Sequence, residues 1–188
     1  RKMHFSSLTI VIPVKNPPNL ELFIKSMDWL LKDNLLVVVD SGGGESIREF
    51  CWRYIKKNCP IWEARRIGYA EVQTEFTLNL DCDTILPSGY VKEALSFLRS
   101  NKADAVAIDY EKPQGHYAFG TSIWKTEVLR RLYNYPPKVV DKLIKIGQQQ
   151  WVTAFQNGFC ECTYMWSRLL NSGGRLETLP YRAKHLKG

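Results

Sequence analysis

The stretch Phe76-Thr-Leu-Asn-Leu-Asp-Cys-Asp-Thr-Ile-Leu-Pro-Ser-Gly-Tyr90 decides the fold and the expected site of this chain. Its beginning, Phe76 to Leu80, is mostly apolar, which is typical of a buried strand. The strand ends in two carboxylates one residue apart, Asp81 and Asp83. Hard divalent cations prefer carboxylate oxygens, so this pair could hold a cation at the open end of a sheet.

Buried strands and helices alternate on both sides of this stretch. Before it, Thr9 to Val14 and Leu35 to Val39 are almost entirely apolar, as expected for parallel strands that are covered on both faces. A helix capped by Asn19 follows the first of them. After the stretch come a helix that starts near Pro87 and a strand, Ala105 to Asp109. This alternation predicts an α/β fold with a mixed, mainly parallel sheet flanked by helices.

Three local predictions fill the gaps between these elements. Ser46 and Glu49 have the spacing of a capping box and predict a helix whose apolar face runs to Ile55. A short strand is predicted at 61–62, and a loop followed by a helix at 65–73.

The pattern changes after Tyr110, which we interpret as the boundary between two halves of a single domain, residues 1–188. The second half is expected to contain helices over 139–155 and 163–170. Residues 175–179 are expected to return to the sheet as a strand.

Composition bounds the class of protein. Hydrophobic residues make up 45% of the 188 residues, which is enough for a packed core and excludes a disordered chain. The formal net charge of +7 favours anionic partners, including peripheral association with an acidic membrane surface. The basic residues are scattered without interleaved aromatics, so no nucleic acid is expected as a partner. No apolar run approaches the roughly 20 residues that span a bilayer.

The five cysteines are odd in number and lack paired CxxC spacing, which argues against a zinc site. Reduced thiols in a cytoplasmic protein are the simplest interpretation, and one disulfide stays open because thermophile cytosols tolerate them. No secretory leader is visible, although the chain opens on Arg1 rather than Met.

Polar side chains follow the predicted parallel strands. Asn16 comes after the first strand, Asp40 after the second, and Asp81 with Asp83 after the strand of the opening stretch. Ligands bind beyond the carboxyl ends of such strands, so we expect the four side chains to share one crevice. The loop from Asp40 to Gly44 could cradle a phosphate, but it matches neither G-x-G-x-x-G nor G-x-x-x-x-G-K-[ST]. Dinucleotide-binding and P-loop interpretations are therefore excluded.

Three segments together resemble the GT-A glycosyltransferases, in particular their large inverting family 2: Ile12-Pro-Val-Lys-Asn16, Val37-Val-Val-Asp-Ser41 and Leu78-Asn-Leu-Asp-Cys-Asp83. Order and spacing agree over residues 8–98, and the short chain resembles a compact member, such as an archaeal or viral one. The resemblance implies a nucleotide-sugar-binding half, residues 1–110, and an acceptor-binding half, residues 111–188. The expected location is the cytoplasm, which would be the host's for a viral member.

The resemblance also implies roles for single residues. The expected nucleotide-sugar contacts come from the strand ends and from the loop predicted before the metal strand: Pro13, Asn16, Asp40, Ser41, Arg66 and Asp81. The expected ligands of Mn²⁺ or Mg²⁺ are Asp81, Asp83 and His185.

The expected general base departs from the family. The segment Glu161-Cys-Thr-Tyr-Met-Trp-Ser-Arg168 resembles the family's Glu-Asp pair followed by Arg, but Cys162 stands where the family commonly has the basic Asp. Two carboxylates remain as candidates for the catalytic base. One is Glu161, and the other is Asp141, near the start of a predicted helix.

The implied activity is metal-dependent, inverting transfer of a sugar from a nucleotide-diphosphate donor to a hydroxyl of a glycan, protein or lipid acceptor. Two alternatives stay open. A nucleotidyltransferase would use a similar sheet, although the loop Lys15 to Asn19 lacks the Gly-rich signature of that class. A degenerate GT-A module that binds nucleotide or glycan without turnover is compatible with Cys162.

Overall fold

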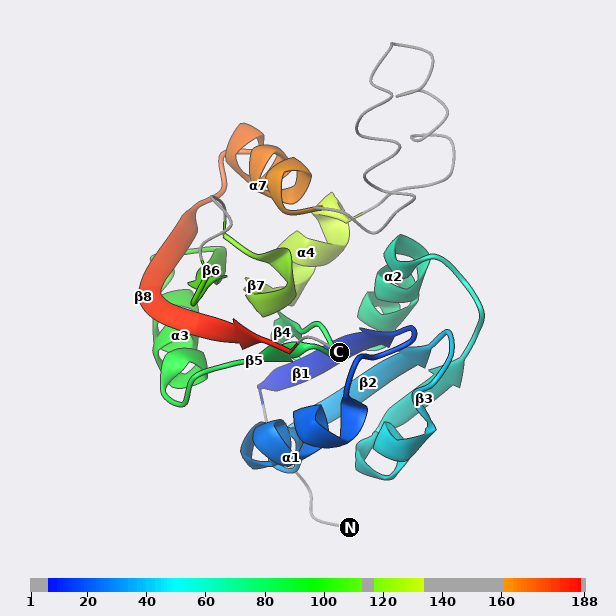
Figure 1. The fold of residues 1–188 in the computed structure, drawn as a ribbon. Helices are drawn as coiled ribbons and strands as arrows, with labels where there is room; N and C mark the ends of the chain where they lie inside the picture. The colour runs from blue at the N-terminus through cyan, green and yellow to red at the C-terminus, as the bar shows by residue number, and fades with distance from the viewer. Residues whose placement is uncertain (1–6, 113–116, 134–160, 187–188) are drawn as a thin grey trace.

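The structure, a computed structural model, describes residues 7–112, 117–133 and 161–186. Its sheet has the strand order β3-β2-β1-β4-β7-β6-β8-β5 (Figure 1). The strands are β1 (Leu8–Val14), β2 (Leu35–Asp40), β3 (Arg53–Lys56), β4 (Phe76–Asn79), β5 (Thr84–Ile85), β6 (Ala105–Tyr110), β7 (Ile123–Lys125) and β8 (Leu176–His185). The α-helices are α1 (Leu20–Leu31), α2 (Ile61–Glu71), α3 (Tyr90–Arg99), α4 (Thr126–Leu132) and α7 (Glu161–Asn171), and the 3₁₀ helices are η1 (Glu45–Phe50) and η2 (Phe119–Thr121).

Strands β3, β2, β1 and β4 are parallel, so their carboxyl ends lie along one edge of the sheet. In the pairing of β1 with β2, Val14 lies opposite Asp40. β7 interrupts this pattern because it runs antiparallel between β4 and β6. β6 and β8 are again parallel. The predicted mixed, mainly parallel sheet flanked by helices is confirmed.

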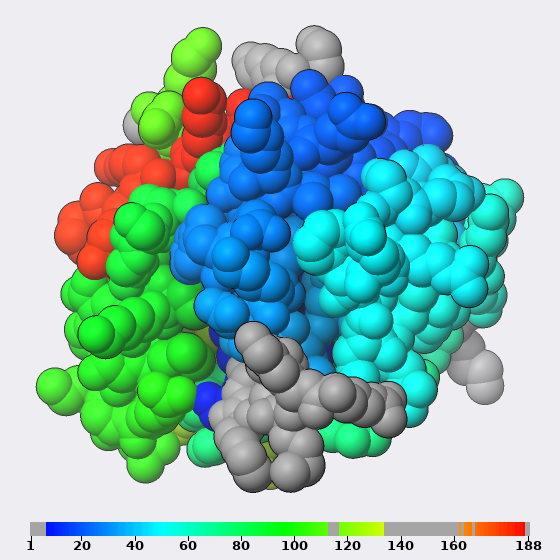
Figure 2. All heavy atoms as spheres, turned by 90° about the horizontal axis from the view of Figure 1, so that it is seen from below, coloured from blue at the N-terminus to red at the C-terminus, as the bar shows by residue number. Residues whose placement is uncertain are grey.

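β1 lies in the middle of the core because helices cover both of its faces. Ile10 and Ile12 pack on the side of α1 and α3, whereas Val11 packs on the side of α2, α4 and α7. A strand covered in this way has no solvent face, which explains its continuous apolar sequence. The two helical layers are visible in Figure 1, and Figure 2 shows the face that α1 and α3 form beside η1 and β3.

α1 begins and packs as its sequence predicts. The side-chain oxygen of Asn19 accepts a hydrogen bond from the Leu22 amide at 3.1 Å, which caps the first turn. The buried positions recur at helical spacing, with Phe23 and Met27 fully buried against the sheet. Each side chain of this size contributes about 1.5–3 kcal/mol when it is fully buried. The apolar side of α1 therefore holds it on the sheet.

The helix predicted from the capping box is wrong beyond Phe50. Ser46 and Glu49 lie in the short 3₁₀ helix η1, and the chain then enters β3. β3 pairs with β2 from Arg53 opposite Val37 onward. Without β3, the backbone N–H and C=O groups on this edge of β2 would lack hydrogen-bond partners. A strand can pair with these groups, whereas a helix uses its own backbone groups internally.

The short strand predicted at 61–62 is also wrong, because these residues begin α2. Pro60 immediately precedes the helix, where its fixed φ and missing N–H cause no conflict. Arg65 and Arg66 consequently lie on a helix and not in the predicted loop.

The helix predicted at 163–170 is confirmed as α7, and the strand predicted at 175–179 is confirmed and extended as β8. β8 pairs first with β6 and then with β5, where His185 lies opposite Thr84. The helix predicted over 139–155 lies outside the described residues. None of the described helices is long and apolar enough to cross a bilayer.

Candidate functional site

A cavity of about 410 Å³ opens at the carboxyl ends of β1, β2 and β4. Its volume is in the range of small-molecule sites, which is about 300–1,000 Å³. The residues predicted for the site that line it are Pro13, Asn16, Ser41, Asp81, Asp83 and His185. The parallel strands bring the first five together, and β8 supplies His185 from a distant part of the sequence.

Two hydrogen-bonded loops form one side of this cavity. The Asn16 amide donates to the carbonyl of Gly42 at 2.9 Å, and the Ser41 amide donates to the carbonyl of Val14 at 2.8 Å. Asn16 has a φ of 47° and Gly43 a φ of 84°, a region that asparagine and glycine tolerate best. The sequence after each strand therefore allows the two loops to lie side by side.

Asp40 organises the second loop from inside. Its side chain is fully buried, and its carboxylate accepts hydrogen bonds from the Gly42 amide at 2.8 Å and from the Gly44 amide at 3.1 Å. The Tyr54 hydroxyl of β3 donates a further bond to the same carboxylate. A Cβ atom on Gly44 would lie 2.7 Å from the carboxylate carbon, so glycine is required there. Asp40 does not line the cavity, and its predicted contact with a nucleotide stays a prediction.

Asp81 lies between a buried cation and a glycine. Arg65 is 5% exposed as a residue, and its guanidinium donates to Asp81 Oδ1 at 2.7 Å. The same guanidinium lies over the Phe119 ring, 5.1 Å from its centroid. On the other side, a Cβ atom on Gly120 would lie 2.1 Å from Asp81 Oδ2. The carboxylate therefore needs both the arginine and the absence of a side chain at residue 120.

Arg66, the predicted nucleotide contact, does not line the cavity. Its side chain is about half exposed, and its guanidinium lies 3.8 Å from the Glu63 carboxylate. On α2, consecutive residues point in different directions, so Arg65 turns inward to Asp81 and Arg66 does not. The sequence placed this segment in a loop and could not distinguish the two arginines.

Asp83 and His185 form a pair across the cavity wall. His185 Nε2 lies 2.8 Å from Asp83 Oδ2, and the Leu186 amide donates to the Asp83 carbonyl at 2.7 Å. Burial raises the pKa of the Asp83 carboxyl, the Asp81 charge raises it further, and His185 opposes the rise. The two carboxylates of the opening stretch thus repel each other within one site.

No group of three or more His, Cys, Asp or Glu side chains within residues 7–112, 117–133 and 161–186 is placed to hold a metal ion. The carboxylates of Asp81 and Asp83 nevertheless fit the smaller requirement of Mg²⁺. This ion commonly takes one or two protein carboxylates and completes its shell with water and substrate phosphates.

The cavity wall also contains Cys162, at the start of α7. Its sulfur accepts a hydrogen bond from the Phe119 amide at 3.2 Å. Glu161 is the first residue of α7, but its side chain is outside the described part of the structure, and so is the whole of Asp141. The two predicted bases therefore stay predictions.

Among the residues of the cavity wall that sequence reasoning missed are Lys15, Cys59 and Cys82. Lys15 could have been found because it stands between Pro13 and Asn16 in a segment already assigned to the site. Cys82 stands between the two carboxylates, and burial followed by the charges of Asp81 and Asp83 raises its pKa to about 12. Nothing in the sequence around Cys59 indicates that it lines the cavity. It reaches the cavity wall only because the fold places the segment after β3 there.

No family model matches the sequence, and no curated protein matches it either. Solved structures do resemble it. Staphylococcus aureus TarS 1-349 in complex with UDP has a TM-score of 0.64 and 16% identity, over 95% of this chain and 60% of that one. TarS 1-349 in complex with UDP-GlcNAc has a TM-score of 0.58 and 15% identity, over 96% and 59%. The bifunctional IspDF of Campylobacter jejuni has a TM-score of 0.57 and 14% identity, over 93% and 49%.

These similarities establish the fold. The open, mainly parallel sheet with helices on both faces is the predicted GT-A, Rossmann-like fold. The chain spans 60% of the TarS 1-349 chain and 49% of the IspDF chain. Sequence identities of 14–16% support a shared architecture, but they do not establish a shared activity.

Proposed function

We propose that the cavity binds a nucleoside-diphosphate sugar and that the protein transfers its sugar to an acceptor hydroxyl, with inversion. The observation that carries this proposal is the convergence of Asn16, Ser41, Asp81 and Asp83 on one cavity at the carboxyl ends of parallel strands. The similarity in fold between this protein and TarS, which was solved with UDP and with UDP-GlcNAc, supports the choice of ligand.

In this proposal Asp83, assisted by Asp81, holds Mn²⁺ or Mg²⁺, with His185 near enough to Asp83 to join or orient the site. A bound divalent cation neutralises negative charge on the leaving diphosphate. Arg65 keeps the Asp81 carboxylate in place, and the mutual repulsion of Asp81 and Asp83 would favour the binding of a cation.

The acceptor proton requires a carboxylate on the opposite side of the donor. Glu161 is proposed for this role because its neighbour Cys162 lies on the cavity wall. Asp141 is the second candidate. Either group would accept the proton as the hydroxyl attacks the anomeric carbon, and attack opposite the leaving diphosphate inverts the configuration.

The first test measures hydrolysis and binding of UDP-GlcNAc with and without Mn²⁺. We expect the Asp83→Ala variant to lose Mn²⁺-dependent donor binding, because one of the two cavity carboxylates is removed. Asp28→Ala is a matched control, since its carboxylate is exposed on α1 and pairs with Lys32. Unchanged nucleotide affinity and metal dependence in the Asp83 variant would reject the metal assignment.

The second test separates the candidate bases. Glu161→Gln or Asp141→Asn is expected to lower turnover while donor affinity stays near that of the wild type, because a base acts on the acceptor. If neither variant slows transfer, both assignments are wrong.

A second candidate function is binding of a nucleotide sugar without turnover. The observation that favours it is Cys162, a thiol engaged with the Phe119 amide on the wall where a basic carboxylate was expected. Binding of UDP-GlcNAc without hydrolysis or transfer to any tested acceptor would support this module. Formation of free UDP would support the enzyme.

A further inference from the structure

A buried amide links β4 to the turn that contains η2. Asn79 is fully buried, its Nδ2 donates to the Phe119 carbonyl at 2.8 Å, and its Oδ1 accepts from the Tyr69 hydroxyl at 2.6 Å. Burying an amide is unfavourable unless it is hydrogen-bonded, and here both of its ends have partners. One side chain therefore joins three elements, α2, β4 and η2.

The turn has hydrogen bonds between its own residues and hydrogen bonds to neighbouring elements. Bonds within it set its shape: Thr121 N–H donates to the Ala118 carbonyl at 3.2 Å, and Ser122 N–H donates to the Phe119 carbonyl at 3.1 Å. Other bonds hold the turn in position. The bonds to β4 and the residues directly after it are the Asn79 side-chain bond, the Asn79 amide to the Ser122 carbonyl at 2.8 Å, and the Asp81 amide to the Gly120 carbonyl at 3.2 Å. The Ala118 amide also donates to the Ile108 carbonyl of β6 at 3.1 Å, and the Phe119 amide donates to Cys162 Sγ of α7 at 3.2 Å.

The position of this turn determines the surroundings of Asp81. Gly120 leaves the space that Asp81 Oδ2 occupies, since a Cβ atom there would lie 2.1 Å away. The Phe119 ring supports the Arg65 guanidinium, which donates to Asp81 Oδ1 at 2.7 Å. A shift of the turn would therefore disturb both sides of the carboxylate at once.

We propose that Asn79 is a positioning residue for the cavity. By holding the Phe119 carbonyl against β4, it fixes the turn and, through the turn, the Asp81 carboxylate two residues further along the chain. Asn79 does not line the cavity, so it can affect a ligand only through the neighbours that it holds, which are the turn and Tyr69 of α2. The consequence for binding rests on the proposed nucleotide function, whereas the link to the turn does not.

The test compares three variants by UDP titration and thermal unfolding. Asn79→Leu removes both bonds of the amide, including the one that the Tyr69 hydroxyl donates, so the variant is destabilised. The double variant Asn79→Leu/Tyr69→Phe also removes that hydroxyl and is expected to recover part of the Tm. In both, the Kd for UDP is expected to rise about tenfold, because small displacements of a binding group are costly.

Thr77→Val is the matched control. It removes a buried bond of the same strand, between the hydroxyls of Thr77 and Thr126 at 2.7 Å, and that bond does not involve the turn. We expect a lower Tm and a UDP Kd within about twofold of the wild type.

Hydrogen exchange of the peptide that covers residues 117–122 gives a readout without ligand. Exchange is expected to be faster in both Asn79 variants and unchanged in Thr77→Val. Unchanged exchange in the Asn79 variants overturns the inference, and so does faster exchange with an unaltered UDP Kd. If the wild type binds none of UDP, GDP and dTDP, the proposed function fails, and the exchange rates alone decide whether Asn79 holds the turn.

Discussion

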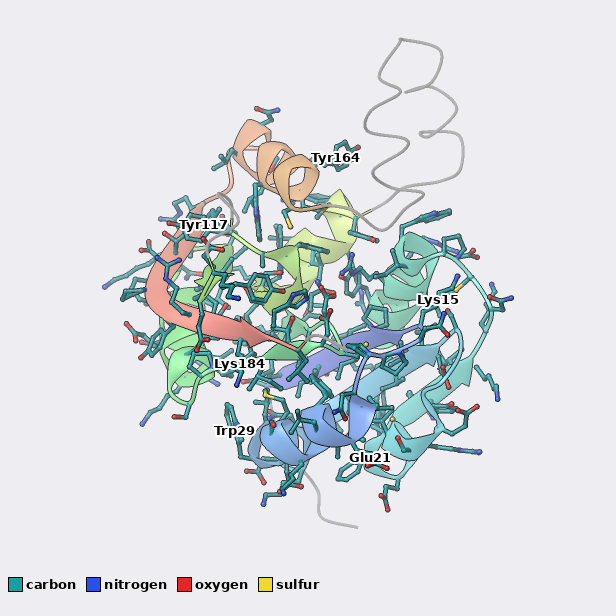
Figure 3. The ribbon with its side chains drawn as sticks, in the orientation of Figure 1. Lys15, Glu21, Trp29, Tyr117, Tyr164 and Lys184 are labelled. Atoms are coloured by element: carbon teal, nitrogen blue, oxygen red, sulfur yellow. The ribbon has the colours of Figure 1, made fainter. Side chains whose placement is uncertain are left out.

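At the scale of single residues, Lys15 differs from the other basic groups near the cavity. Arg65 contacts Asp81 at 2.7 Å, and His185 contacts Asp83 at 2.8 Å. Within the described part of the chain, no ion pair includes Lys15. Its side chain is exposed and lines the cavity from the loop after β1 (Figure 3). Lys15 is therefore well placed to meet an anionic ligand in the cavity, which in the proposed function is the diphosphate of the donor.

We predict that Lys15→Ala raises the Kd for UDP about tenfold and leaves the affinity for uridine unchanged, because a charged hydrogen bond contributes about 1.5–3 kcal/mol. Competition titrations with the two ligands measure the difference. Lys184→Ala is the control, since Lys184 is exposed on β8 but does not line the cavity. Equal weakening of UDP and uridine would place Lys15 away from the phosphates.

At the scale of elements, β3 holds the loop after β2 through Tyr54 and the buried carboxylate of Asp40. We predict that Tyr54→Phe lowers the free energy of unfolding by about 1–3 kcal/mol, because a buried carboxylate loses a donor. Urea denaturation measures this change. Tyr181→Phe is the comparison, since it removes a hydroxyl bonded to Glu93 at 2.7 Å near the surface and should cost less. Equal losses of unfolding free energy in the two variants would show that the bond to the buried Asp40 carboxylate stabilises the fold no more than the bond near the surface.

The elements that the sequence predicted correctly are those with a strong pattern of their own. β1 and β2 are continuous apolar runs, and α1 has both a cap and an apolar side. The errors fall at 45–56 and 61–62, where local patterns were weak. Residues 53–56 form a strand because they pair with β2, and residues 61–62 begin a helix directly after Pro60. Neither effect is visible in the periodicity of the apolar residues.

The candidate site was predictable for a topological reason. Parallel strands end at one edge, so Asn16, Ser41, Asp81 and Asp83 had to converge. Asp40 and Arg66 were placed less well, because their orientation depends on β3 and on the helical geometry of α2. The link from Asn79 to Phe119 joins residues 40 positions apart and leaves no local trace in the sequence.

At the scale of the whole molecule, a ligand that binds only the folded protein stabilises it by an amount that grows with the logarithm of the ligand concentration divided by its Kd. We predict that UDP with Mn²⁺, at about 100 times its Kd, raises the Tm by roughly 5–10 °C. Thermal unfolding with UDP-, GDP- and dTDP-sugars, each with and without EDTA, measures the effect and ranks the bases. A shift that EDTA leaves intact would argue against the cation, and the absence of a shift with all three would argue against a nucleotide ligand.

The pairing of Asp83 with His185 also has a consequence for the order in which the protein assembles. The two residues are 102 positions apart, whereas the parallel strands β1 to β4 lie within residues 8–79. Joining the ends of a longer segment costs more chain entropy, and contacts of high sequence separation form slowly. During folding or synthesis, the strand framework can thus form before β8 arrives. A nascent chain of this kind would have the loops after β1 and β2 before it has the wall that His185 completes.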